Sequence, residues 1–336
     1  MKPLRIGTRG SALALWQANH VCARLSESHG VQSELVRIRT SGDHFQTGSV
    51  ALVGTKGVFI KELEDALLAG TIDLAVHSMK DVPTEVPSGL AFPAITKRED
   101  PRDCLVSHSS LRLGDLPAGA RVGTSSLRRQ AQLRRYRPDL QLLDLRGNVD
   151  TRLKKVAASE FDAIVLALAG IKRLGASDKV TEMLPTDMML PAVGQGALGI
   201  ETRSDDSETA NLVASLDDAE TRACVTAERG LMRELEGGCQ VPLGALARFL
   251  GGQSFSSDIN SLPRERASAS EASQPDRVRS GEISIEAAVF SPDGKDFVRR
   301  ELRGSSDDAA ALGKRLGQVL IDAGADRILR LVGRPA

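Results

Sequence analysis

Apolar and polar positions follow two different periods along the first 200 residues, and the period of each segment predicts a strand or a helix. Residues 4–8 form a short apolar run, and 11–28 place apolar side chains on one helix face. The same order recurs, with strands expected at 33–40, 72–78, 120–126, 140–147 and 162–170 and helices at 59–70, 126–136 and 148–158. This alternation predicts an α/β fold whose sheets are covered by helices on both faces.

The pattern changes after Thr202. Two helices are expected near 206–215 and 218–235, and they are followed by strands at 242–250, 282–290 and 297–304 and a closing helix at 306–323. This order predicts a smaller α+β module. Between its first two strands, residues 254–280 hold eight serines, two prolines and few large apolar side chains. Such a segment cannot bury enough apolar surface to order itself, so we expect a flexible insertion over about 250–281.

Length and composition describe a globular protein of several domains, since 336 residues exceed one ordinary core. No apolar run is long enough to cross a bilayer, and the N-terminus lacks the apolar core of a signal peptide, so we expect a cytoplasmic location without membrane contact. Cys22, Cys104, Cys224 and Cys239 match neither a zinc motif nor a disulfide framework. Reduced cysteines and no bound metal are therefore expected.

Arginine makes up 33 of the 44 basic residues, although the formal net charge is zero. Its planar guanidinium pairs with carboxylates through two bonds, which suggests a cleft for acidic ligands; a GC-rich genome is the competing explanation. Residues 121–155 carry ten Lys or Arg against three Asp, a net of +7. Nucleic acid would be the rival ligand. An aromatic content of 3% and the absence of a nucleic-acid-binding signature argue against it.

Three predicted helix starts combine small hydroxyl residues with arginine. Free backbone N–H groups at a helix start already favour an anion, and hydroxyl and guanidinium groups would select a carboxylate or phosphate. One such junction is an ordinary helix cap, but three in one chain indicate anion binding. The side chains concerned are Arg9 and Ser11, then Thr124, Ser125, Ser126, Arg128 and Arg129, then Arg146 and Arg152.

The segment "AVHSMKDVPT" follows a strongly apolar strand, so Ser78, Lys80 and Asp81 should emerge at its carboxyl end, where α/β sheets place ligands. Asp81 beside cations should stay ionised and could stabilise a developing positive charge, although a strand-ending salt bridge is an equal alternative. His77 is expected to be structural. No ATP-binding loop is found, and the glycine-rich residues 41–59 predict a mobile loop over the cleft.

Nine segments in order resemble the porphobilinogen deaminase (hydroxymethylbilane synthase) family, over about 4–248 and again from 282. They are "TRGSALALWQA", "KGVFIKELEDALL", "DLAVHSMKDVP", "REDPRDCLVS", "VGTSSLRRQAQL", "LRGNVDTRL", "DAIVLALAGIKRLG", "LPAVGQGALGIE" and "ERGLMRELEGGCQVPLG". The resemblance implies two type II periplasmic-binding-protein-like α/β domains and a smaller α+β C-terminal domain. We place domain 1 at 1–96 and 197–216, domain 2 at 97–196 and domain 3 at 217–336.

The resemblance also implies an activity and a site. Cys239, in a glycine-flanked turn, would hold a dipyrromethane cofactor through a thioether. Four porphobilinogens would be added to this primer with loss of ammonia, and hydroxymethylbilane would be released. Asp81 matches the catalytic carboxylate, which would stabilise the azafulvene cation left when ammonia departs. The cofactor contacts would be Ser78, Lys80, Asp81, Thr124, Ser126, Arg128, Arg129 and Arg146, and the substrate contacts Arg9, Ser11, Arg146, Arg152, Arg173, Lys56, Phe59 and Gln195.

The family is expected to be monomeric, with porphobilinogen as its small-molecule partner. Two rival functions remain open from the residues alone. One is a non-enzymatic two-lobed protein that captures an acidic solute, which the same fold would permit. The other is a hydrolase with a cysteine nucleophile, for which no family-type signature is present.

Overall fold

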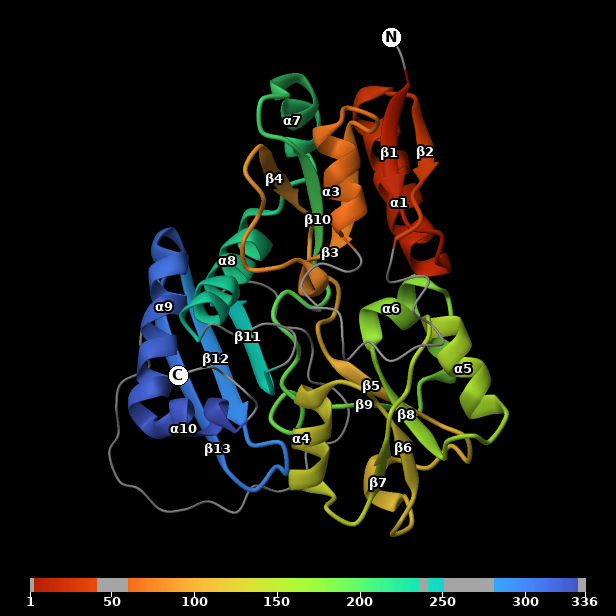
Figure 1. Cartoon of the computed structure of the whole chain (residues 1–336), viewed down its shortest axis with the longest axis vertical. Helices are drawn as coiled ribbons and strands as arrows, with labels where there is room; N and C mark the ends of the chain where they lie inside the picture. The colour runs from red at the N-terminus through yellow and green to blue at the C-terminus, as the bar shows by residue number, and fades with distance from the viewer. Residues whose placement is uncertain (1–2, 41–59, 236–240, 251–280, 332–336) are drawn as a thin grey trace.

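The computed structural model describes residues 3–40, 60–235, 241–250 and 281–331, and these residues form three separate sheets. Figure 1 shows them as three groups of elements: one beside α1 and α7, one beside α4, α5 and α6, and one beside α8 and α9. Two groups are α/β and the third is a small α+β unit. The expected fold class is therefore confirmed.

The first sheet has five strands in the order β2-β1-β3-β10-β4. Helices α1 and α7 bury apolar side chains such as Val21 and Val213 against one face, while α3 covers the other face with Leu63 and Leu67. Both faces are thus covered by helices, as predicted. The elements are β1 (Leu4–Thr8), α1 (Ala12–His29), β2 (Ser33–Arg37), α3 (Lys61–Leu68), β3 (Leu74–Ser78), β4 (Leu90–Ile95), β10 (Leu198–Arg203) and α7 (Ser207–Ala214).

The second sheet has the order β7-β6-β8-β5-β9. Leu133 of α4 packs on one face, and Val156 of α5 and Ile171 of α6 pack on the other. The chain passes between the two sheets twice, from β4 to β5 and from β9 back to β10. The elements are β5 (Asp103–Ser107), β6 (Arg121–Gly123), α4 (Leu127–Tyr136), β7 (Gln141–Leu143), α5 (Val149–Ala157), β8 (Ala163–Ala167), α6 (Leu168–Arg173) and β9 (Glu182–Met183).

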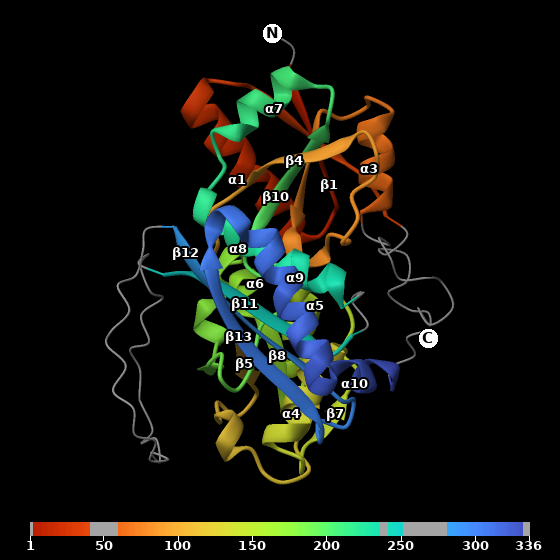
Figure 2. The ribbon, with the colours of Figure 1, turned by 90° about the vertical axis from the view of Figure 1, so that its left-hand side faces the viewer.

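The third sheet, β11-β12-β13, is antiparallel and lies under α8 and α9, as the rotated view in Figure 2 shows. Alternate residues of β12 face opposite ways: Ile283 and Ile285 join the core under α8 and α9, whereas Ala288 and Phe290 pack on Ala131 of α4. The sheet therefore joins its own helices to the second α/β unit. The elements are α8 (Ala219–Glu234), β11 (Leu243–Phe249), β12 (Glu282–Phe290), β13 (Phe297–Ser305), α9 (Ala309–Leu320) and α10 (Asp326–Arg330).

One predicted element is partly wrong. The strand expected at 162–170 ends at Ala167, and helix α6 begins at Leu168. Leu168 and Ile171 stay buried in the helix, so the apolar run continues without showing where the strand stops. The proposed domain boundaries stay a prediction. Among the described helices, none combines the length and the apolar character needed to cross a bilayer.

Candidate functional site

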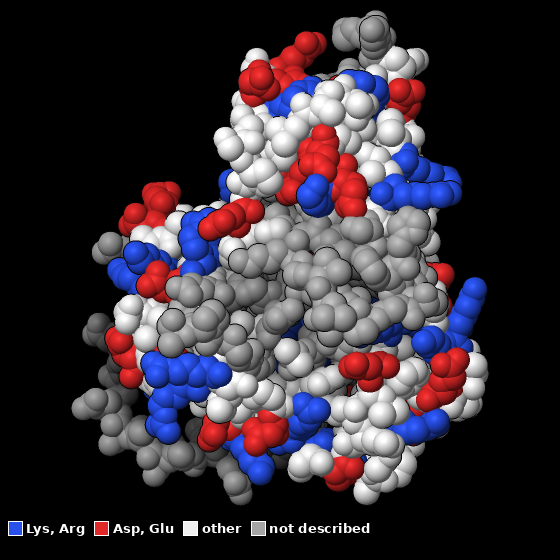
Figure 3. All heavy atoms as spheres, in the orientation of Figure 1, with Lys and Arg blue, Asp and Glu red and all other residues white. Residues whose placement is uncertain are grey.

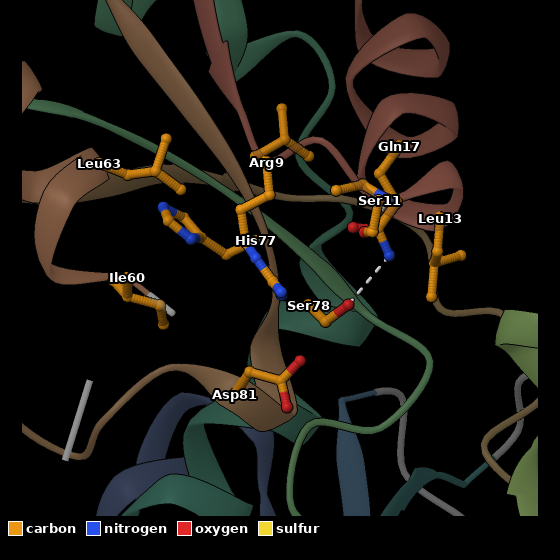
Figure 4. Close-up of a pocket in the computed structure, with 11 residues that line it drawn as sticks. Arg9, Ser11, Leu13, Gln17, Ile60, Leu63, His77, Ser78 and Asp81 are labelled. Atoms are coloured by element: carbon orange, nitrogen blue, oxygen red, sulfur yellow. Dashed lines mark hydrogen bonds between the residues drawn. The ribbon is translucent and has the colours of Figure 1, made fainter. Parts of the chain in front are cut away.

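The turn after β3 carries the predicted catalytic carboxylate. β3 ends at Ser78, and a 3₁₀ turn, Met79–Asp81, buries Met79 while it leaves Asp81 exposed. Gln17, buried on α1, donates a hydrogen bond from Nε2 to the Ser78 hydroxyl at 2.9 Å. Figure 4 shows this bond and places Arg9, Ser78 and Asp81 around one pocket, which Ser11 also lines. The start of the first helix and the turn after β3 therefore line one pocket.

A larger cavity of about 250 Å³ lies between the two α/β units. The first unit contributes the start of α1 and the turn after β3, and the second contributes residues of α4, α5 and α6. Among the described residues, five cationic side chains line the cavity against two acidic ones, so their charge favours an anionic ligand. The cations are Arg9, Lys80, Arg129, Arg152 and Arg173, and the acids are Asp81 and Asp150; Ser11, Ser78 and Gln195 also line it.

Arg152 and Arg173 are held by backbone carbonyls. Arg152 Nε donates to the Gly147 carbonyl and Arg173 Nη2 to the Gly196 carbonyl, each at 2.7 Å. Burial lowers the pKa of each guanidinium to about 10, so both remain charged at neutral pH. Neither forms an ion pair with a carboxylate of the described chain. Two cations placed in this way can donate hydrogen bonds to carboxylates of a ligand.

Lys80 has a lowered pKa, and Arg173 contacts an aromatic ring of the other α/β unit. Burial lowers the pKa of Lys80 to about 8; Asp81 opposes this shift and Arg129 reinforces it. Lys80 therefore changes charge just above neutral pH. The Arg173 guanidinium lies 5.9 Å from the ring centroid of Trp16 on α1, so Arg173 connects the two α/β units across the cavity.

Asp103, at the start of β5, anchors two of the predicted arginines. It is fully buried and accepts from Arg128 Nη1 at 2.7 Å and from Arg129 Nη2 at 2.8 Å. Gln195 Nε2 also donates to it at 2.8 Å. Burial alone would raise the pKa of Asp103, but Arg128 and Arg129 outweigh burial and hold it below the ordinary value. The sequence analysis missed Asp103; an acidic residue that opens a fully buried strand was the available signal.

The two arginines differ in position. Arg129 lines the cavity, whereas Arg128 is not among the lining residues and also donates to the Leu190 carbonyl at 2.6 Å. Ser126 caps α4 by accepting from the Arg129 backbone N–H, and Thr124 Oγ1 accepts from the Ser126 N–H at 3.3 Å. Arg146 is exposed and precedes Gly147, which lines the cavity. Ligand contacts for Thr124, Ser126, Arg128 and Arg146 stay predictions.

Three predicted site residues, Lys56, Phe59 and Cys239, lie outside the described residues, as does the whole glycine-rich segment 41–59. His77 is buried, with Nε2 2.9 Å from Glu201 Oε2 on the neighbouring strand β10.

Basic and acidic side chains are interspersed over the described part of the face in Figure 3. Within the described ranges, no group of three or more His, Cys, Asp or Glu residues could hold a metal ion.

Family models match two parts of the chain. Residues 4–211 match the model described as "Porphobilinogen deaminase, dipyromethane cofactor binding domain", and residues 222–260 match "Porphobilinogen deaminase, C-terminal domain". The chain belongs to the porphobilinogen deaminase family. The first match contains the cation-lined cavity, and the second contains Cys239.

Curated relatives agree over nearly the whole chain. The porphobilinogen deaminase of Pelotomaculum thermopropionicum is 47% identical over 330 residues, which cover 98% of this chain and 96% of the relative. That of Desulforudis audaxviator is 48% identical over 331 residues, covering 97% of each. Porphobilinogen deamination in porphyrin biosynthesis is therefore the function of this chain. This function is favoured over the alternative of a non-enzymatic solute-binding protein.

Solved structures of substrate-binding proteins are more distant. The methionine binding protein MetQ is 13% identical, with a TM-score of 0.41 over 63% of this chain and 89% of that chain. A likeness at this level adds nothing to the family assignment.

Proposed function

We propose that this chain is a hydroxymethylbilane synthase, which adds four porphobilinogens to a dipyrromethane joined by a thioether to Cys239. The cation-lined cavity between the two α/β units, with Asp81 at its wall, is the observation that carries the proposal. Every pyrrole of the substrate and product bears an acetate and a propionate. A growing chain of such rings needs many cations, and this cavity supplies them where water is partly excluded.

The residues present fit the dipyrromethane. Arg152 and Arg173 keep their positive charge and are held by carbonyl oxygens, so their remaining N–H groups are available to ligand carboxylates. Lys80 and Arg129 line the same cavity and would hold further carboxylates of the cofactor. When bound, the dipyrromethane supplies the free pyrrole carbon to which the first porphobilinogen is joined. Arg9 and Ser11, which line both pockets, would hold the incoming substrate.

Asp81 would act through its charge. When bound porphobilinogen loses ammonia, the remaining substrate fragment is a cation, and a fixed carboxylate nearby stabilises it. The turn after β3 presents Asp81 into the cavity, while buried Met79 anchors the turn. After the cation has formed its new carbon–carbon bond, the same carboxylate can take the proton that the attacking ring carbon releases.

Intact-mass measurement of the native protein tests the attachment. We expect a mass above that of the sequence by two linked pyrrole units, and a Cys239→Ser variant at the bare sequence mass. Cys22→Ser is the matched control, because Cys22 is partly exposed on α1 and should not affect loading. An active native protein at the bare sequence mass would refute the proposal.

Turnover of an Asp81→Asn variant tests the catalytic role. We expect turnover to be lost while the added mass is retained, because the variant keeps the shape of the side chain and removes its charge. Asp150→Asn removes a second acidic side chain that lines the cavity and should keep most of the turnover. Near-normal turnover of Asp81→Asn would reject Asp81 as the catalytic carboxylate. Monomeric state and cytoplasmic location stay predictions, the first checked by size-exclusion chromatography with light scattering.

A further inference from the structure

Helix α8 holds the chain directly after Asp81 through one arginine. The Arg229 guanidinium donates to three consecutive backbone carbonyls, at 3.1 Å to Val82, 2.5 Å to Pro83 and 3.2 Å to Thr84. These carbonyls follow Asp81 without a gap. α8 belongs to the third unit and ends at Glu234, shortly before Cys239 in the sequence.

The three carbonyls are what hold this cation. Arg229 is partly buried, and burial lowers its pKa to about 10, with a smaller contribution from Arg233. It forms no ion pair with a carboxylate of the described chain, so its charge is balanced by carbonyl dipoles. Hydrogen bonds from a charged donor are roughly twice as strong as neutral ones. Three of them restrain the chain after Asp81 more strongly than ordinary loop contacts would.

Two neighbours of Arg229 on α8 restrain other parts of the same region. Val225 packs with Met79 and Val82 in one apolar cluster, on either side of Asp81 in the sequence. Glu228 accepts from the Gly194 N–H at 2.6 Å and pairs with Arg98 at 2.6 Å. These residues recur at the helical spacing of one face, so a single face of α8 holds the whole turn.

Gly194 lies close against the same turn. It has φ +70°, and a Cβ atom placed there would come within 2.9 Å of Met79 Cβ and 3.0 Å of the Met79 backbone carbon. A side chain at 194 would displace the turn. The segment between β9 and β10, which contains Gly194, and helix α8 therefore both confine the Asp81 turn. Arg229 is the residue of α8 that binds the chain after Asp81.

We propose that Arg229 is a positioning residue for the reaction: it ties the Asp81 turn to the helix that leads into the Cys239 loop. The inference rests on the proposed roles of Asp81 and Cys239. It assigns Arg229 no contact with substrate. Its effect is to hold the turn that carries Asp81 in a constant position against α8 through each addition.

Arg222 offers a matched control on the same helix. It also donates to carbonyls of the first α/β unit, those of Phe92 and Pro93, but these lie on β4 and are not part of the Asp81 turn; Arg222 pairs with Asp217 as well. Arg229→Met and Arg222→Met each remove a guanidinium that joins the third unit to the first. Both should lower the melting temperature, and only Arg229→Met should move Asp81.

Steady-state kinetics and intact mass of the two holoenzyme variants test the inference. We expect kcat of Arg229→Met to fall about tenfold to a hundredfold, the order that a small misplacement of a catalytic group costs. KM should stay within about threefold, because the cavity cations that bind carboxylates are unchanged. Both variants should carry the added mass, Arg222→Met should keep kcat within about twofold, and Arg229→Lys should recover part of the rate.

Each outcome decides a separate point. Wild-type kcat in folded Arg229→Met would overturn the inference, and so would an equal loss in Arg222→Met. If Arg229→Met fails to fold, the same comparison between Arg229→Lys and Arg222→Lys decides. Asp81→Asn is measured alongside: if it keeps turnover, the proposed function fails, whereas an inactive Asp81→Asn with fully active Arg229→Met counts against Arg229 alone.

Discussion

Replacing Asp103 with Asn removes a negative charge that two buried arginines share. The carboxylate is fully buried and accepts three charge-assisted hydrogen bonds, from Arg128, Arg129 and Gln195. Asn keeps the shape of the side chain, but it offers one oxygen instead of two, and its amide would face guanidinium donors. The variant therefore leaves two buried cations whose remaining partners are carbonyl oxygens, those of Leu190 and Val165.

The structure sets the size of the effect. Removing one partner of a buried ion pair costs about 3–5 kcal/mol, because the remaining charge is left without compensation. The matched control is Asp162→Asn, which breaks a pair with Arg121 in the same α/β unit whose side chains are 40% and 41% exposed. An exposed pair of this kind contributes at most about 1 kcal/mol. The difference between the two variants isolates the contribution of burial.

Chemical denaturation followed by circular dichroism measures both variants. We expect the free energy of unfolding to fall by about 3–5 kcal/mol for Asp103→Asn and by about 1 kcal/mol or less for Asp162→Asn. Because the pKa of Asp103 is lowered in the folded state, its contribution is present above the ordinary Asp value and is lost as pH falls below it. Equal losses in the two variants would show that backbone carbonyls suffice to hold the buried arginines.

Three further predictions concern ligand binding and the insertion. Loading of the dipyrromethane onto the cofactor-free protein should weaken as pH passes about 8, where Lys80 loses its charge, and Lys80→Arg should remove that loss; loading that does not change with pH would contradict it. Arg152→Leu should raise KM about tenfold or more, because a hydrogen bond to a charged group contributes about 1.5–3 kcal/mol. The free energy of unfolding should not fall. An unchanged KM would exclude Arg152 from the site. Replacing 254–280 with a short turn should preserve activity, because Phe249 and Ile283 already pair across β11 and β12; an inactive but folded deletion would show that the segment is needed.

Local pattern predicted much of the fold and part of the site. The helix expected at 11–28 is α1, Ala12–His29, because its apolar face and the Ser11 cap are encoded in neighbouring residues. Arg9, Ser78 and Asp81 meet at one pocket because each lies at or just after the end of a strand in the same sheet. The antiparallel strands β10 and β5 were not predicted, since each pairs with strands distant in the sequence.

The sequence by itself determined the family, the α/β and α+β order and the residue types that an acidic ligand requires, because motifs and periodicity are local properties of a chain. Only the tertiary structure decided how each cation is used. Arg128 and Arg129 share buried Asp103, Arg152 and Arg173 are held by carbonyl oxygens at the wall of the cavity, and Arg229 holds the chain that follows Asp81. The physical reason is that the function of a guanidinium depends on its burial and on the acceptors within reach. Folding brings those acceptors from segments that are distant in the sequence, so the periodicity of the sequence does not predict which acceptor each guanidinium binds.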